Sequence, residues 1–175
     1  MALTKINNNS LPSGSVLQLI SETKTDTQTI TGQTFTDVLT ATITPKSSNS
    51  KIYIMCTLNF TCYSGSDSDL GERYGAAKLY RDSTQIALGD AASNREQVWF
   101  SSNTVNGQNN AFTMFQSSGS FTDSPASTSA ITYKVKCATS ASSTEKIIIN
   151  STGPDNDFNY SHRGASTLTL IEIAG

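Results

Sequence analysis

Apolar and polar residues alternate along several short segments of the chain, with the period of two that is typical of a half-buried β-strand. The clearest segment is 51–63, KIYIMCTLNFTCY, whose inward face is predicted to carry Ile52, Ile54, Cys56, Leu58, Phe60 and Cys62. Segment 131–139 repeats the pattern, with Ile131, Tyr133, Val135 and Cys137 inward. No segment has a convincing helical period, so the pattern predicts an all-β protein.

Further strands are expected between clusters of Ser, Gly, Asn, Asp and Pro, which favour turns. Their ranges are 16–21, 25–31, 35–44, 76–81, 84–88, 97–101, 110–116, 146–150 and 167–173. Asp82 and Ser83 are predicted at the tip of a hairpin, and long polar loops at 64–75, 101–110, 117–129 and 151–165. About ten short strands with this spacing indicate an antiparallel β-sandwich or jelly roll.

The first and last of these strands carry apolar residues on both faces. In 167–173, Leu168 and Leu170 fall on one face and Ile171 and Ile173 on the other. In 16–21, the two faces carry Val16 with Ile20, and Leu17 with Leu19. A sandwich strand has one wet face unless something covers it. Either loops or a second subunit must cover the other face, and we expect a subunit.

Length and charge narrow the class of protein. With 175 residues the chain is long enough for one domain, expected at 15–175 after a polar arm at 1–14. The net charge is −2 and the 12 Lys and Arg residues are scattered, so nucleic acid is not an expected partner. The start lacks an apolar signal core, and no apolar run approaches the roughly 18 residues that span a bilayer. We expect a protein made in the cytoplasm without secretion or membrane insertion.

The candidate chemistry is sparse. Cys56 and Cys62 lie six residues apart on one strand and cannot pair, so the three cysteines, with Cys137, are expected as reduced buried thiols. His162 is expected as a surface loop histidine, since no second His or Cys lies near it and no GxSxG motif occurs. The acids that could cleave glycosides or bind calcium are Asp67, Asp69, Glu72, Asp155 and Asp157. Solvated loop acids explain them equally, and we expect no enzyme, no cofactor and no metal.

Aromatic residues near loops are the remaining signal. They are Tyr63, Tyr74, Trp99, Phe158 and Tyr160, among Asn, Asp and Ser. Sugars stack on aromatic rings while amides and carboxylates bind their hydroxyl groups, so these residues are compatible with a shallow glycan site. Core or interface packing explains them as well, especially Trp99 beside Phe100.

Five segments, in this order, carry a family resemblance: MALTKINNNSLPSGSVLQ, TITPKSSNSKIYIM, LYRDSTQIALGD, DSPASTSAITYKVK and STLTLIEIAG. Nearly the whole chain resembles small structural proteins and fibre-tip domains of tailed bacteriophages, particularly those of marine and cyanobacterial hosts. The resemblance implies a jelly-roll module that forms homotrimers on the virion surface, similar to trimeric C1q and tumour-necrosis-factor domains. In such folds the first and last strands are neighbours in the sheet that faces the threefold axis. It therefore implies a trimer interface that contains Val16, Ile20, Ile171 and Ile173.

The functional expectation is a non-enzymatic phage virion protein. No long shaft precedes the expected domain, which favours a capsid decoration or short fibre whose arm, 1–14, docks on other virion proteins of the capsid or tail. One alternative is a tail-fibre tip that attaches to host surface glycan through the loop aromatics. A glycan-cleaving enzyme is a second alternative, supported only by the loop acids.

Overall fold

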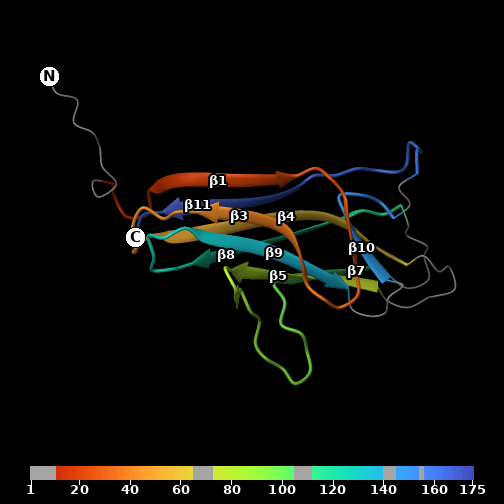
Figure 1. The fold of residues 1–175 in the computed structure, drawn as a ribbon, viewed down its shortest axis with the longest axis horizontal. Coiled ribbons are helices and arrows are strands. Elements are labelled where there is room, and N and C mark those ends of the chain that lie inside the picture. Colours follow the sequence, from red (N-terminus) through yellow and green to blue (C-terminus); the bar gives the residue numbers. More distant parts are fainter. Residues whose placement is uncertain (1–10, 65–72, 105–111, 140–144, 154–155) are drawn as a thin grey trace.

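The computed structural model describes residues 11–64, 73–104, 112–139, 145–153 and 156–175, and within these ranges it contains strands and no helix (Figure 1). The strands are β1 (Val16–Lys24), β2 (Gln28–Thr31), β3 (Thr36–Ile43), β4 (Lys51–Ser64), β5 (Arg73–Arg81), β6 (Thr84–Ile86), β7 (Phe100–Thr104), β8 (Phe115–Asp123), β9 (Ile131–Thr139), β10 (Glu145–Ile149) and β11 (Ser166–Ile173). The predicted all-β class is confirmed.

The strands form two antiparallel sheets. Sheet A has the order β1-β11-β4-β10-β2, with β8 also paired to β4, and sheet B has the order β3-β9-β5-β6, with β7 also paired to β5. Both β11 and β10 pair with successive parts of β4, at 51–57 and 60–64. From β2 to β5 and again from β7 to β10, the chain changes sheet at every connection. This course is that of a jelly roll, as expected.

The core lies between the inner faces of the two sheets. The residues predicted to face inward on β4 and β9 are all buried, which confirms the alternation pattern. Leu168 and Leu170 of β11 also lie in this core and are fully buried. The three cysteines are free and buried within it. Full burial of one large aliphatic side chain stabilises the folded state by about 1.5–3 kcal/mol, so these two sheets hold each other mainly by apolar contact.

The last strand is held on both of its edges. β11 pairs with β1 on one side and with β4 on the other, so the expected neighbourhood of the first and last strands is confirmed. Beyond the strand, the backbone N–H of Ala174 donates to the carbonyl of Ser15 at 2.8 Å, and that of Gly14 donates to the carbonyl of Ala174 at 2.8 Å. Chain ends usually fray, but these bonds keep the carboxyl terminus in place.

The sequence prediction is wrong at β7, a strand at Phe100–Thr104 where a loop was expected from 101, and more extensively at β8. Within the described residues, which resume at 112, a strand at Phe115–Asp123 pairs with β4 along its length, where a strand at 110–116 and a loop at 117–129 were expected. Its Ser-rich sequence resembles a loop, but Gly119 leaves room for two large rings. A Cβ atom at this position would lie 2.7 Å from the Trp99 ring and 2.8 Å from the Phe100 ring. At position 119, therefore, rings from the chain before β8 fill the space that a side chain of β8 would occupy.

Candidate functional site

The outer face of sheet A is almost free of charge. Residues directly opposite each other in an antiparallel pair share a face, so the register defines this surface. Its positions on four of the strands, β1, β4, β8 and β11, are Val16, Leu19, Ser21, Thr23, Lys51, Tyr53, Met55, Thr57, Asn59, Gln116, Ser118, Ser120, Thr122, Thr167, Thr169, Ile171 and Ile173. Lys51, at one end, is the only charged residue among them.

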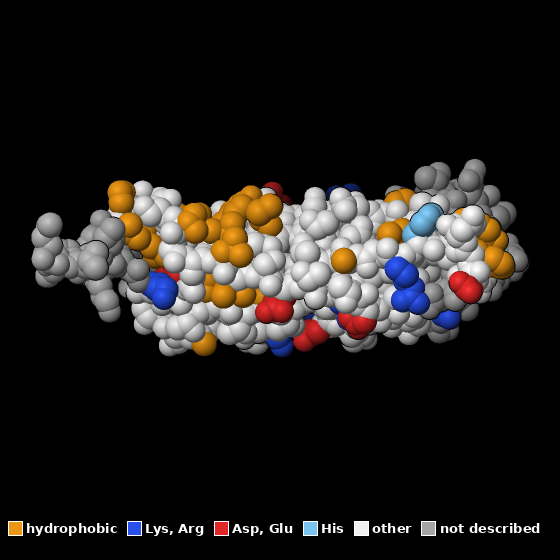
Figure 2. Space-filling view, turned by 90° about the horizontal axis from the view of Figure 1, so that it is seen from above, with side chains coloured by type: hydrophobic (Ala, Val, Ile, Leu, Met, Phe, Trp, Pro, Cys, Tyr) orange, Lys and Arg blue, Asp and Glu red, His pale blue; other side chains and the backbone are white. Residues whose placement is uncertain are grey.

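Part of this face is apolar and exposed. Val16 is 63% exposed, Leu19 57% and Met55 46%. The half-buried side chains of Tyr53, Ile171 and Ile173 lie among them, because Val16 is opposite Ile173, and Ile171 is opposite both Leu19 and Tyr53. We call these six residues the apolar patch. Figure 2 shows hydrophobic side chains gathered over the half of the molecule that carries the ends of β1 and β11 nearest the termini.

A β-bulge corrects one residue of the predicted interface. The pairing of β1 with β11 shifts between Val16 and Gln18, so alternation is interrupted there. Val16 therefore lies on the outer face with Leu19. Ile20 lies opposite Leu170 and packs against the core, so the prediction that it shares a face with Val16 is wrong. Ile171 and Ile173 lie on the outer face, as the alternation predicts.

The outer face of sheet B has the opposite character. The Asp37 carboxylate lies 3.4 Å from the Lys134 ammonium group and 3.0 Å from that of Lys136, and Lys78 forms an ion pair with Glu96. Partial burial pushes the pKa of Asp37 upward, but the two lysines outweigh this and hold that pKa below its ordinary value. Paired surface charges of this kind are typical of a face in contact with water.

Two buried carboxylates, those of Asp123 and Glu172, form hydrogen bonds at the end of the sandwich that carries the apolar patch. Asp123 accepts bonds from Arg81 Nη1, at 2.9 and 3.1 Å, and from the Tyr133 hydroxyl at 2.7 Å. Burial, together with this hydrogen bond to Asp123, raises the pKa of Tyr133. Glu172 accepts bonds from Gln18 Nε2 and from the backbone N–H of Lys46, both at 2.6 Å. Internal donors occupy both carboxylates, which indicates a structural role for each.

The structure places the aromatic residues of the predicted glycan site in different parts of the molecule. Trp99 packs beside Phe100 against the core, with the ring centroids 5.2 Å apart, so the packing interpretation holds for it. The side chain of Tyr63 lies outside the described residues. Tyr74, Phe158 and Tyr160 are exposed, and they line or adjoin two different surface hollows.

The first is the tip hollow, of about 350 Å³, lined by Asn156, Asp157, Phe158, Ser161, His162 and Arg163. Beside it, Tyr160 contacts Phe158 in a stacked pair and Phe112 in an edge-to-face pair, with centroids 5.0 and 4.8 Å apart. The segment that carries these residues connects β10 to β11 at the end of the sandwich opposite the carboxyl terminus (Figure 1). His162 is exposed, as predicted.

The second is the side hollow, of about 550 Å³, on sheet B. Tyr74 lines it with Gln33, Phe35, Arg95, Glu96 and Thr139, which the sequence did not single out. The adjacent charges Arg95 and Glu96, in a chain with few charged residues, were the available signal. Their position beside Phe35 follows only from the fold.

Of the acidic candidates, Asp157 alone lies within the described residues. Asp67, Asp69, Glu72 and Asp155 lie outside the described residues, and Asp157 is an exposed residue of the tip hollow. In the part of the chain that the structure describes, no group of three or more His, Cys, Asp or Glu residues could hold a metal ion. The same part contains no helix that is long and apolar enough to cross a membrane.

No protein-family model matches the chain, and no curated protein matches its sequence. Among solved structures, the chain is similar to the infectious bursal disease virus Gt strain (13% identity, TM-score 0.40) and Gx strain (14%, 0.41), and it is covered completely in both. It is also similar, over 92% of its length, to the VP2 subviral particle of that virus (12%, 0.41). The chain spans 43%, 42% and 39% of those three chains. At such identities and TM-scores, the likeness assigns no function to this chain.

Proposed function

We propose that this chain is a non-enzymatic structural protein of a phage virion, a capsid decoration or short fibre protein, and that it assembles as a homotrimer through the outer face of sheet A. The observation that carries the assembly is the apolar patch on the outer face of sheet A, where Lys51 is the one charged residue among the described positions of β1, β11, β4 and β8. The other cation on this face, Lys146, is on β10, opposite Tyr63. The virion assignment rests on the sequence segments that resemble phage structural proteins.

A second copy of the chain is the occupant that suits this face best. The patch offers shape and apolar area but no charge for a partner to complement, which favours contact between like surfaces. Exposed Val16, Leu19 and Met55 would be removed from water on assembly, and each square ångström of apolar surface buried contributes about 25 cal/mol. Threefold symmetry is what the family resemblance implies, and it closes the assembly so that no patch remains exposed.

This arrangement explains the difference between the two sheets. In this arrangement sheet A turns its apolar patch to the threefold axis, and sheet B turns its paired charges, such as Asp37 with Lys136, to the solvent. Three copies per trimer and many trimers per virion convert weak contacts into avidity. The arm at 1–14 would attach the trimer to other virion proteins, leaving the sandwich on the virion surface.

The assembly is tested by placing a carboxylate in the patch. The purified protein should have three times the 18.7 kDa mass of one chain in size exclusion coupled to light scattering. Leu19→Asp should give monomers or aggregates, because three carboxylates would then meet in an apolar seam. Thr40→Asp is the matched control, since Thr40 is exposed on sheet B opposite Lys134 and a carboxylate there meets a cation. A monomeric parent protein, or a Leu19→Asp trimer as stable as the parent, would refute the proposed interface.

The attachment role is tested by removing the arm. Residues 1–14 contain little apolar surface, so the deletion should leave the trimer intact and abolish its capture by virions that lack the protein. Unchanged capture would move the attachment surface elsewhere. Antibody labelling of virions in electron microscopy then distinguishes head from tail.

One observation favours an alternative function, a tail-fibre tip that recognises host surface glycan. Phe112, Phe158 and Tyr160 form a cluster of exposed rings beside the tip hollow, at the end opposite the carboxyl terminus. Exposed aromatic faces at such a position are suitable for stacking on sugars. Binding of the trimer to isolated host polysaccharide, lost in Tyr160→Ala, would favour this alternative, and its absence would favour decoration alone.

A further inference from the structure

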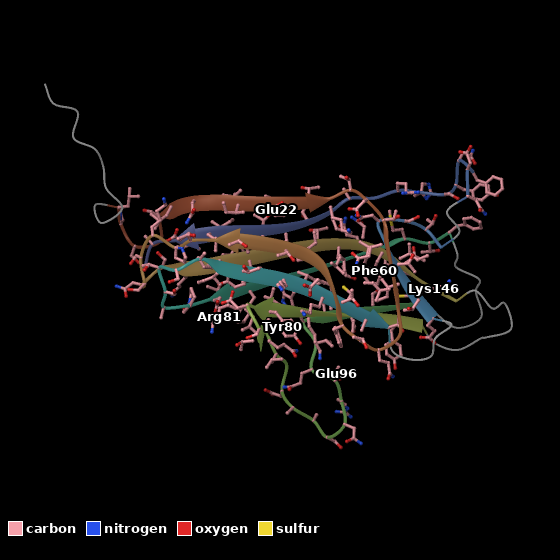
Figure 3. The ribbon with its side chains drawn as sticks, viewed as in Figure 1. Glu22, Phe60, Tyr80, Arg81, Glu96 and Lys146 are labelled. Atoms are coloured by element: carbon pink, nitrogen blue, oxygen red, sulfur yellow. The ribbon has the colours of Figure 1, made fainter. Side chains whose placement is uncertain are left out.

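The side hollow lies where the loop between β6 and β7, residues 87–99, leans against sheet B. Figure 3 shows Glu96 on this loop, below β5, and Figure 1 shows how far the loop extends from the sheet. Gln33 and Phe35 come from the connection between β2 and β3, Tyr74 from β5, and Thr139 from the end of β9. Four separate segments therefore converge on one cavity of about 550 Å³, within the range of small-ligand sites.

The walls of the hollow are held in place by the protein itself. Gln85 Nε2 donates to the carbonyl of Gln97 at 2.9 Å, and Gln97 Nε2 donates to that of Gly89 at 2.6 Å, which together fix the base of the loop. The Lys78 ammonium group lies 4.1 Å from the centre of the Phe35 ring and also pairs with Glu96. These contacts join the loop to Phe35, so a ligand would meet a preformed site and lose less entropy on binding.

One cation at the hollow has no compensating charge beside it. Lys78 and Glu96 compensate each other in their ion pair. Arg95 is exposed, and its guanidinium group has no ion-pair or hydrogen-bond partner among the residues described. A turn presents this residue, since the backbone N–H of Arg95 donates to the carbonyl of Ala92 at 3.1 Å and Ser93 has a φ of 52°. The hollow therefore presents a planar guanidinium group, which can bind a carboxylate through two parallel hydrogen bonds.

The neutral groups around Arg95 are those that bind sugar rings. The Tyr74 ring is 45% exposed and offers an apolar surface for the C–H face of a pyranose. Gln33 and Asn94 place amide groups at the hollow, where sugar hydroxyls need both donors and acceptors. Thr139 lies at its buried side, and its hydroxyl has no hydrogen-bond partner within the described part of the chain.

We propose that the side hollow binds a carboxylate-bearing sugar, a hexuronic acid unit of an acidic polysaccharide, with Arg95 on the carboxylate and Tyr74 against the ring. This inference goes beyond the proposed virion role and does not require the trimer. It is compatible with it, because the hollow is on sheet B and the proposed interface is on sheet A, so assembly would leave all three hollows open.

The test is a calorimetric and NMR titration of the full chain with trigalacturonate, and with maltotriose as a neutral trisaccharide of the same length. Trigalacturonate should bind saturably with a Kd on the order of 1 mM, and maltotriose at least roughly tenfold more weakly. Arg95→Ala and Tyr74→Ala should each weaken trigalacturonate binding by roughly tenfold. Lys51→Ala, which removes an exposed cation from sheet A, should leave it unchanged.

Several outcomes would overturn the inference. They are absence of saturable trigalacturonate binding, equal binding of maltotriose, unchanged binding in Arg95→Ala, or a loss of binding in Lys51→Ala that matches the loss in Arg95→Ala. Light scattering on each variant keeps this result separate from the assembly proposal, since Tyr74 is on sheet B and Arg95 is on the loop that packs against sheet B, opposite the sheet that carries the apolar patch. A trimer that does not bind trigalacturonate refutes the sugar site alone.

Discussion

Among single residues, Glu172 is the most sensitive polar position of the terminal strand. It is fully buried on the core face of β11, and donors from Gln18 and Lys46 bind its two carboxylate oxygens. In Glu172→Gln an NH₂ group replaces one of these oxygens and faces a donor, which should lower the free energy of unfolding by about 1–3 kcal/mol. Urea denaturation measures this loss.

The matched control for that substitution is Glu22→Gln. Glu22 is exposed on β1, which Figure 3 shows at the edge of the sandwich, so its substitution should change the free energy of unfolding by less than about 0.5 kcal/mol. Equal stability of Glu172→Gln and the parent protein would mean that the buried carboxylate is not what fixes Gln18 and Lys46.

The cysteine thiols should be inert in the folded protein. Burial raises the pKa of Cys56 and of Cys62 to about 12, and raises that of Cys137 as well. At pH 8 only about one thiol in ten thousand with a pKa near 12 is ionised, and the thiolate is the reactive species. Ellman's reagent should therefore detect no thiol in the native protein and three in denaturant. Rapid labelling of the native protein would contradict the buried placement.

Alternation predicts which residues face the core only where a strand is regular and its outer face is open. Ile52 and Val135 were predicted correctly on this basis. Ile20 was not, because the bulge between Val16 and Gln18 adds a residue to the count. Alternation along 51–63 places Thr61 on the outward face with Tyr53, but Thr61 is fully buried, and its hydroxyl donates to the carbonyls of Thr113 and Ser151 at 2.7 and 2.9 Å. Contacts with distant segments of this kind leave no periodic signal.

At the level of elements, β8 depends on a residue without a side chain. Gly119→Ala would place a Cβ atom 2.7 Å from the Trp99 ring and should destabilise the fold by about 1–3 kcal/mol through overpacking. It should also shift the fluorescence of Trp99, the only tryptophan. Thermal unfolding and emission spectra measure both effects.

Gly89→Ala is the control for this prediction, because no atom lies within 4 Å of a Cβ at Gly89. If Gly119→Ala has the same Tm and the same fluorescence as the parent protein, the packing of Trp99 and Phe100 over β8 is not as described. The same packing helps to explain why the strand was missed, since at Gly119 the apolar contact comes from Trp99 and Phe100, and Phe121 of β8 also packs against the core.

For the whole molecule, the sequence was sufficient to predict the β-sandwich and the strands at the two ends of the chain. The apolar residues on both faces of 167–173 indicated a second cover, and the patch around Ile171 and Ile173 lies where that pattern places it. The side hollow was not predictable, because Phe35, Tyr74 and Arg95 are far apart in sequence and meet only through the order of strands in sheet B. That order depends on long-range pairing, which local patterns do not encode.

If folding and assembly are coupled through the apolar patch, the thermal stability of the protein must depend on its concentration. A trimer that unfolds to separate chains gains stability from mass action, so its Tm rises as the concentration of chains rises. Dilution from about 100 μM to about 1 μM should lower the Tm of the parent protein by several degrees. Thr40→Asp should behave in the same way, since Thr40 lies on the opposite sheet. Leu19→Asp, where it stays soluble, should melt at a lower temperature that no longer depends on concentration. A parent Tm that is equal at both concentrations would mean that each sandwich is stable alone and that Val16, Leu19 and Met55 are exposed without contributing to its stability.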